Sequence, residues 1–348
     1  MSHARGYLVH TGNDTLTWIA QNVLPEGFIG VTFFYVLSGF ILNFGYAQRM
    51  SEKSVRNADF LFFRFARLYS VHFLFLVAAI PLNLALFGGH GVFGMGLFGV
   101  NALLLQGWYP HQGVYSSFNQ VSWSLSDEMF FYCVFCLLVG LGRRALFILL
   151  AVALFAVAAS MAACHYNACS SLFSQWLFYI NPLFGLVNFL IGVMLSRIYC
   201  ARLDQAPLFP PYVKHLSVVA LFFMVFVALV AEVDISYRYD LFYVVPMALI
   251  VYSFAEGRHV FPGSIKFLGH ASFVFYMSHL LVMRYFDLYA GTAEVSGVWA
   301  GLVFVGMLGL CLVLSGLVYQ YYERPINQKL RGYWTAWRTR RDLVLMNG

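Results

Sequence analysis

The stretch Val121-Ser-Trp-Ser-Leu-Ser-Asp-Glu-Met-Phe-Phe-Tyr132 places two carboxylates at the start of an apolar segment that ends near Leu141. A charged side chain inside a membrane helix costs roughly 2.5–3.5 kcal/mol on insertion scales. Asp127 and Glu128 therefore need a partner, a water-filled cavity or a function. An interfacial position is the alternative, because acidic residues favour the positive end of a helix dipole. Glu128 fits this alternative less well, since three apolar residues follow it at once.

The composition is that of an integral membrane protein. Of 348 residues, 61% are hydrophobic and 10% are charged, and the mean hydropathy is +0.74. A soluble domain carries about 25% charged residues. The net charge of +6 comes from short loops and does not indicate a nucleic-acid partner. The sequence has no Gly-rich phosphate loop, no zinc-ligand spacing and no Gly-x-Ser-x-Gly elbow, so we expect no bound cofactor or metal.

Long apolar runs predict an all-α polytopic bundle of about nine to ten transmembrane helices in a single domain, residues 1–348. Residues 88–107 are Gly-rich and then apolar, and we expect them to be re-entrant or to lie at the outer surface. A polar, aromatic loop follows them. The expected spans are 28–46, 68–87, 123–141, 145–163, 176–199, 215–231, 241–255, 270–289 and 298–320.

The positive-inside rule gives this layout an orientation. With the basic loop 47–67 in the cytoplasm, all Lys and Arg residues except Arg5, Arg238 and Arg284 fall on the cytoplasmic side. The basic tail 321–348 then lies in the cytoplasm. This orientation holds only if residues 88–107 do not cross the membrane completely. A full crossing would move every later loop to the opposite side and place most Lys and Arg residues outside. Residues 1–26 then lie outside, and we expect one further helix to precede them.

Four of the six cysteines carry an expectation. Cys133 and Cys136 lie on an apolar helix, where we expect core positions. Cys164 and Cys169 flank a short polar loop and can pair if that loop faces an oxidising compartment.

Arg64 and Arg67 lie where the basic loop enters a span. At positions i and i+3 of a helix they share one face. Paired guanidinium groups suit phosphates, which favours a nucleotide-containing donor. Membrane anchoring and lipid head-group contact are the alternative.

Histidine is the usual general base near neutral pH. His3 and His10 lie near the terminus, where a surface position is the ordinary outcome. His72, His270 and His279 lie in or next to spans and are expected to be hydrogen-bonded core or interface residues.

The stretch Gly27-Phe-Ile-Gly-Val-Thr-Phe-Phe-Tyr-Val-Leu-Ser-Gly-Phe-Ile-Leu42 carries small residues along a membrane helix. Such residues allow helices to approach closely. The alternative is that these small residues form an unobstructed helix surface, against which a flexible tail of the substrate can lie.

Several ordered motifs together resemble the membrane-bound acyltransferase family 3 of bacterial cell-surface sugar O-acyltransferases. One is the glycine stretch just quoted, and another is the arginine pair in Arg64-Phe-Ala-Arg67-Leu-Tyr. A third is Trp123-Ser-Leu-Ser-Asp-Glu128. The remaining two are Phe267-Leu-Gly-His-Ala-Ser-Phe-Val-Phe-Tyr-Met-Ser-His279 and Tyr322-Glu-Arg-Pro325. They cover residues 27–325.

The resemblance implies a donor, usually acetyl-CoA, and acyl delivery to a hydroxyl on the far side of the membrane. It implies a catalytic histidine on the first helix, here His3 or His10, with Glu128 as its partner. The family spacing from a basic residue cannot be checked for either histidine, so both stay open. Other positions that the motifs predict to contact substrate or CoA are Arg64, Arg67, Ser38, Trp123, Ser124, Asp127, Tyr276 and His279.

The expected function is therefore transfer of an acyl group, acetyl by resemblance, from acetyl-CoA to a surface glycan or its lipid-linked precursor. The expected location is the bacterial inner membrane, in contact with membrane lipids and with a cytoplasmic C-terminus. Two alternatives stay open. A transporter or exporter of polysaccharide would carry charges on several helices and two similar halves. A structural subunit would have lost activity with the first helix.

Overall fold

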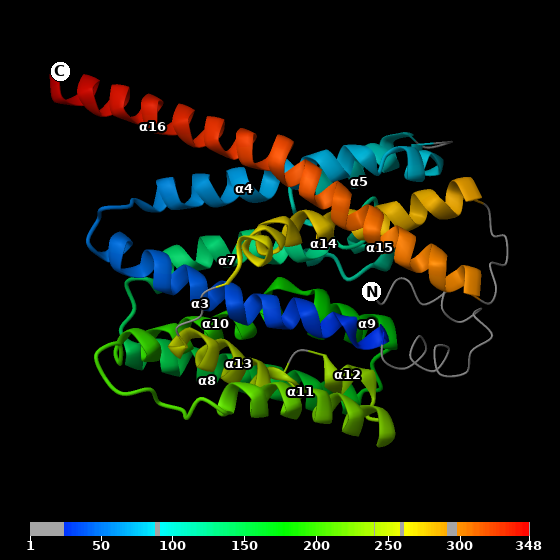
Figure 1. The fold of residues 1–348 in the computed structure, drawn as a ribbon, viewed down its shortest axis with the longest axis horizontal. Coiled ribbons are helices and arrows are strands. Elements are labelled where there is room, and N and C mark those ends of the chain that lie inside the picture. The colour runs from blue at the N-terminus through cyan, green and yellow to red at the C-terminus, as the bar shows by residue number, and fades with distance from the viewer. Residues whose placement is uncertain (1–23, 88–90, 240, 258–260, 291–297, 348) are drawn as a thin grey trace.

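The computed structural model describes residues 24–87, 91–239, 241–257, 261–290 and 298–347. These residues form helices and no strand, and the long helices lie side by side in one bundle (Figure 1). The predicted all-α class is confirmed.

The long helices match the nine predicted spans. They are α3 (Ile29–Ser51), α4 (Asn57–Ala78), α7 (Trp123–Leu138), α8 (Arg143–Tyr166), α10 (Pro182–Cys200), α11 (Val213–Val230), α13 (Val244–Glu256), α14 (Gly263–Ala290) and α15 (Val298–Val318). In the described part of the chain, seven helical segments are long and apolar enough to cross a membrane. Helices α7 and α13 are shorter and complete the bundle. The span predicted at 68–87 had both ends wrong: α4 begins at Asn57 and ends at Ala78.

Short helical pieces connect the long ones. They are η3 (Leu24–Phe28), η4 (Pro81–Phe87), α5 (Gly91–Ala102), η5 (Gln106–Trp108), α6 (Gln112–Tyr115), α9 (Ser171–Gln175), η6 (Trp176–Ile180) and α12 (Ile235–Arg238). Local chemistry starts some of these elements: the Asn181 side chain accepts a hydrogen bond from the Leu183 N–H, and Pro182 occupies the first turn of α10.

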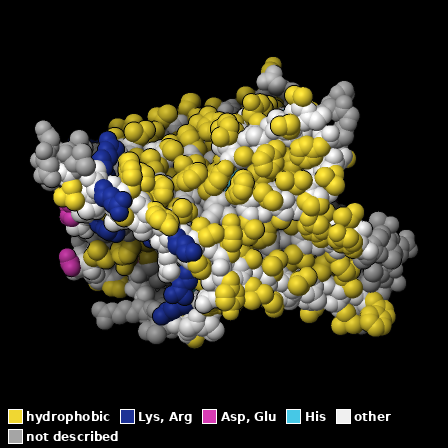
Figure 2. All heavy atoms as spheres, turned by 90° about the horizontal axis from the view of Figure 1, so that it is seen from above, with side chains coloured by type: hydrophobic (Ala, Val, Ile, Leu, Met, Phe, Trp, Pro, Cys, Tyr) yellow, Lys and Arg dark blue, Asp and Glu magenta, His cyan; other side chains and the backbone are white. Residues whose placement is uncertain are grey.

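Cross-helix contacts fix the direction of each helix. Helices α3, α7 and α10 end together, since Arg197 near the end of α10 donates to the carbonyls of Leu138 and Leu141 and contacts Asn43 of α3. Helix α4 starts at the same end. We call it the basic end, because Lys and Arg side chains gather there (Figure 2). The other end, where α8 finishes and α12 lies, is the outer end.

The polypeptide between α4 and α7 does not cross the bundle. Helix α5 has 12 residues, about 18 Å, against a hydrocarbon thickness of about 30 Å. Its last residues reach the middle of α4, where the His72 ring pairs with the Asn101 carbonyl at 2.9 Å. The Ser126 hydroxyl of α7 donates to the Leu104 carbonyl at 2.6 Å, so the next span starts at that depth. The described part of this segment, 91–107, therefore does not cross the bundle, as the charge pattern requires.

The basic tail is helical and is held against α4. A π-helical turn, η7 (Tyr319–Glu323), joins α15 to α16 (Arg324–Asn347). Buried Asp59 of α4 accepts a hydrogen bond from Trp334 Nε1 at 2.9 Å and forms an ion pair with Arg338. The tail thus lies at the basic end, as the charge pattern predicts.

The cysteine expectations have mixed outcomes. Cys164 and Cys169 form a disulfide at the outer end, as predicted. Cys136 is half-buried, but Cys133 is exposed on the surface of α7, so its predicted core position was wrong. The two cysteines are three positions apart on the helix, so their side chains are offset by about 60° around its axis, and one can face the protein while the other faces its surface.

Candidate active site

A cavity of about 470 Å³ opens between α3, α4, α7 and α14 in the half of the bundle nearer the basic end. We call it the inner cavity. Six of the sequence-predicted site residues line it, namely Ser38, Arg64, Arg67, Ser124, Glu128 and Tyr276. They come from four helices and from positions up to 238 residues apart in sequence, and the fold alone brings them together.

Glu128 is the acidic residue of this cavity. Its side chain is 6% exposed, and the Tyr132 hydroxyl, one helical turn later, donates a hydrogen bond to Oε1. Ser38 of α3 and the guanidinium groups of Arg64 and Arg67 also interact with the carboxylate. A buried carboxylate is retained when it has such partners. These partners therefore offset the free energy that is lost when the Glu128 carboxylate is removed from water.

Arg64 and Arg67 project from one face of α4, as their spacing predicts. The Arg64 guanidinium lies over the Tyr46 ring, with 4.6 Å from Cζ to the ring centroid. Its Nε atom is buried and has no hydrogen-bond partner among the described residues, while Arg67 is exposed at the cavity wall. Two guanidinium groups with spare donors form an anion site suited to phosphate.

Asp127 does not line this cavity, contrary to the expectation of substrate contact. It points to the other side of α7, is 0% exposed, and its Oδ2 accepts a hydrogen bond from the Tyr35 hydroxyl at 2.7 Å. Gly107 and Gly185 pack around it. Asp127 therefore links α7 to α3 inside the protein.

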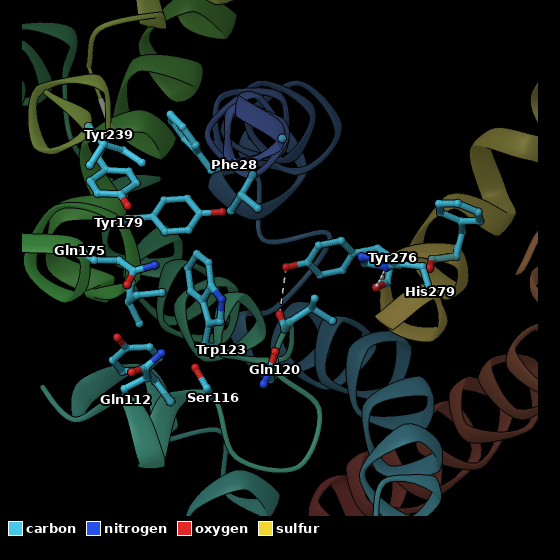
Figure 3. Close-up of a pocket in the computed structure, with 17 residues that line it drawn as sticks. Phe28, Gln112, Ser116, Gln120, Trp123, Gln175, Tyr179, Tyr239, Tyr276 and His279 are labelled. Carbon is cyan, nitrogen blue, oxygen red and sulfur yellow. Dashed lines mark hydrogen bonds between the residues drawn. The ribbon is translucent and has the colours of Figure 1, made fainter. Parts of the chain in front are cut away.

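Trp123 and His279 lie at a second cavity, of about 450 Å³, toward the outer end (Figure 3). We call it the outer cavity. Gly27, Val31 and Tyr276 line both cavities. The Tyr276 hydroxyl donates to the Val121 carbonyl at 2.9 Å and lies 2.9 Å from the Ser124 hydroxyl, so a hydrogen-bonded tyrosine stands between the two spaces.

The glycine stretch lines the inner cavity at some positions and packs closely against α10 at others. Gly27 and Gly30 line the inner cavity, and a Cβ added at Gly30 would meet nothing within 4 Å. A Cβ at Gly39 would lie 2.1 Å from the Phe189 carbonyl oxygen of α10, and one at Gly192 would lie 2.0 Å from the Val36 carbonyl oxygen. Close packing of α3 on α10 at Gly39 thus lies in the same length of α3 whose Ser38 and Leu42 line the cavity.

The two candidate histidines, His3 and His10, lie outside the described residues, so neither is placed relative to Glu128. His72 is buried and hydrogen-bonded, as expected. His270 is exposed and its ring stacks on Tyr319, so it is not a core residue. The described residues contain no group of three or more His, Cys, Asp or Glu that could hold a metal ion.

The structure adds residues that the sequence reasoning missed. Tyr132 was not singled out, although its position four residues after Glu128 places it on the same helix face. The roles of Tyr35 and Tyr46 follow only from their contacts with side chains of other helices. Glu323, within the terminal motif Tyr322-Glu-Arg-Pro325, is 3% exposed and interacts with Arg67, which connects that motif to the inner cavity.

Comparison with known proteins identifies the family. The family described as "Acyltransferase domain" matches residues 1–316. The chain is 26% identical over 337 residues to the acyltransferase MdmB of Streptomyces mycarofaciens, covering 87% of this chain and 82% of the relative. No solved structure matches. The comparisons support acyl transfer and give no support to the transporter alternative. The protein is therefore a polytopic membrane protein that belongs to acyltransferase family 3, and it is an O-acyltransferase.

Proposed function

We propose that this enzyme transfers an acetyl group from cytoplasmic acetyl-CoA to a hydroxyl of a cell-surface glycan or of its lipid-linked precursor. The inner cavity carries the proposal, because it combines an arginine pair near the basic end with a buried carboxylate farther in. CoA is anionic through its phosphates, and arginine pairs bind phosphates by bidentate hydrogen bonds.

In this proposal the phosphates bind Arg64 and Arg67, and the flexible arm of CoA extends along the wall formed by Gly27 and Gly30. The thioester then reaches the level of Glu128 and Tyr276. Glu128 orients the catalytic base, His3 or His10, which takes the proton of the acceptor hydroxyl. The basic end faces the cytoplasm of a bacterial inner membrane, since Lys and Arg concentrate in cytoplasmic loops.

The test is acetyl-CoA-dependent transfer by membranes that contain wild type, Glu128→Gln or the control Glu52→Gln at matched protein levels. Glu52 lies exposed in the loop after α3. General-base assistance contributes about 10²–10⁴-fold, so Glu128→Gln should reduce transfer by at least about 100-fold, and Glu52→Gln should not reduce it.

Unchanged transfer by Glu128→Gln would exclude Glu128 from the chemistry. Absence of any acetyl transfer or acetyl-CoA hydrolysis in wild type would reject acetyl-CoA as donor and support either another acyl group or the inactive-subunit alternative.

A further inference from the structure

The outer cavity has the size and shape of a binding site. Its volume of about 450 Å³ falls within the range of about 300–1,000 Å³ that small-molecule sites occupy. It meets the inner cavity at Gly27, Val31 and Tyr276. A molecule held there lies on the opposite side of Tyr276 from the proposed donor.

Flat aromatic surfaces form one side of this cavity. Trp123 packs edge-on against Tyr179, with ring centroids 4.7 Å apart, and Tyr179 stacks on Tyr239 at 5.3 Å. Figure 3 shows these rings on one side of the space and Tyr276 with His279 on the other. Aromatic faces of this kind pack against the C–H face of a pyranose ring.

Neutral hydrogen-bonding groups lie around the aromatic surface. The amide side chains of Gln112, Gln120 and Gln175 line the cavity, and each amide both donates and accepts. This combination matches a hydroxyl group, which also donates and accepts.

Tyr115 provides an independent indication that the cavity receives a polar ligand. Its side chain is 3% exposed, yet its hydroxyl has no hydrogen-bond partner among the described residues, and it lines the cavity. Buried polar groups in proteins are nearly always hydrogen-bonded. A ligand hydroxyl in the outer cavity would supply the missing partner.

Among the described residues, the lining of the outer cavity also differs from that of the inner one in charge, with the imidazole of His279 as its titratable nitrogen group. Of its lining residues in the described part of the chain, none is Lys, Arg, Asp or Glu. The nearest charges have partners: Arg238 pairs with Glu26, and Asp234 accepts from the Ser236 N–H at 2.7 Å. Burial raises the pKa of Tyr239 to about 12, so this tyrosine stays protonated and neutral.

We propose that the outer cavity is the acceptor site and that it selects an uncharged sugar ring over a carboxylated one. The proposal rests on the proposed function. A carboxylate placed there would lose water without gaining a Lys or Arg partner among the described lining residues. A neutral ring would stack on the aromatic side and bond to the amides and to Tyr115.

The transfer step then takes place beside Tyr276. The acceptor oxygen forms a bond to the acyl carbon, the carbon–sulfur bond of the thioester breaks, and the hydroxyl proton ends on the CoA sulfur as a free thiol. No further co-reactant is required.

The experiment compares p-nitrophenyl β-D-glucoside with p-nitrophenyl β-D-glucuronide, which differ by one carboxylate. Full-length protein in lipid nanodiscs is assayed for acetyl transfer to each, and for quenching of its tryptophan fluorescence by each. We expect the glucoside to be acetylated and to quench at roughly 10- to 100-fold lower concentration than the glucuronide, the range for an unpaired charged group.

Tyr115→Phe tests the role of the unpartnered hydroxyl, and exposed Tyr109→Phe, outside the cavity, is the matched control. Tyr115→Phe should raise the acceptor KM by about tenfold, the loss of one hydrogen bond, without raising the acetyl-CoA KM. If Tyr115 had only a structural role, Tyr115→Phe would change the thermal stability of the protein and would not change the acceptor KM.

The outcomes separate the two proposals. Equal use of both glycosides would overturn the neutral acceptor site and leave the proposed function standing. Quenching by the glucoside without any acetyl transfer would retain the site and overturn the proposed donor. Absence of quenching by either glycoside would overturn the site.

Discussion

Replacing Gly39 with alanine should destabilise the protein, whereas the same replacement at Gly30, nine residues earlier on the same helix, should not. A methyl group at Gly39 would lie 2.1 Å from the Phe189 carbonyl oxygen and 3.0 Å from the Val193 nitrogen. Normal contact between such atoms is about 3.5–4.0 Å, so α10 would have to move by more than about 1 Å. Overpacking of this kind costs about 1–3 kcal/mol. At Gly30 nothing lies within 4 Å, and Gly→Ala then gains about 0.4–1 kcal/mol from the unfolded chain.

The expected difference between the two variants is therefore about 2–3 kcal/mol, or on the order of 5 °C in melting temperature. It can be measured by heating detergent-solubilised protein and following the monodisperse fraction by size-exclusion chromatography. Gly30→Leu adds a functional measurement, because its larger side chain would narrow the inner cavity and raise the acetyl-CoA KM. Equal destabilisation by Gly30→Ala and Gly39→Ala would refute the assignment of Gly30 to a cavity wall.

Three further predictions follow from the same contacts. Arg64→Lys should raise the acetyl-CoA KM about tenfold or more with a smaller change in kcat, because lysine cannot bind phosphate bidentately; Arg49→Lys at the end of α3 is the control, and an equal effect of both would reject the donor site. Asp127→Asn should keep transfer within about threefold of wild type, since the amide oxygen still accepts the Tyr35 hydrogen bond; a loss as large as that of Glu128→Gln would place Asp127 in the chemistry. Exposed Cys200, at the basic end, should react with a membrane-impermeant maleimide in inside-out vesicles and not in intact spheroplasts, and the opposite pattern would reverse the proposed orientation.

The sequence predicted nine of the long helices because a span requires a long apolar run, and such runs are visible residue by residue. It did not predict the 24-residue helix α16, whose sequence is basic and polar. The distribution of Lys and Arg, and not the local pattern, predicted that residues 88–107 do not cross, since their apolar side chains resemble those of a crossing helix; the described residues 91–107 do not cross the bundle. The predicted start of α4 was eleven residues too late, because the charged residues before Leu68 were interpreted as part of a loop. Packing of Asp59 against Trp334 and Arg338 stabilises that helical extension.

The candidate site was predicted in part. Ser38, Arg64, Arg67, Ser124, Glu128 and Tyr276 were each named from motifs, and all line one cavity. Asp127 and Glu128 are neighbours in sequence, and no sequence pattern separates them. They point to different sides of α7, because successive residues on a helix are rotated by about 100°. Only the positions of Tyr35 and Arg64 on other helices decide which carboxylate faces the cavity.

By itself, the sequence determined that this protein is a helical membrane protein with its positive charges at one end, and its motifs indicated acyl transfer. Those properties follow from local composition and order, which the amino-acid sequence states directly. The tertiary structure alone decided that the described site residues line two adjacent cavities, that Tyr276 stands between them, and that Arg and Glu side chains line one of them and not the other. The physical reason is that a cavity is bounded by side chains from several helices, and their relative rotation and depth are set by packing between helices, such as the close approach at Gly39 and Gly192.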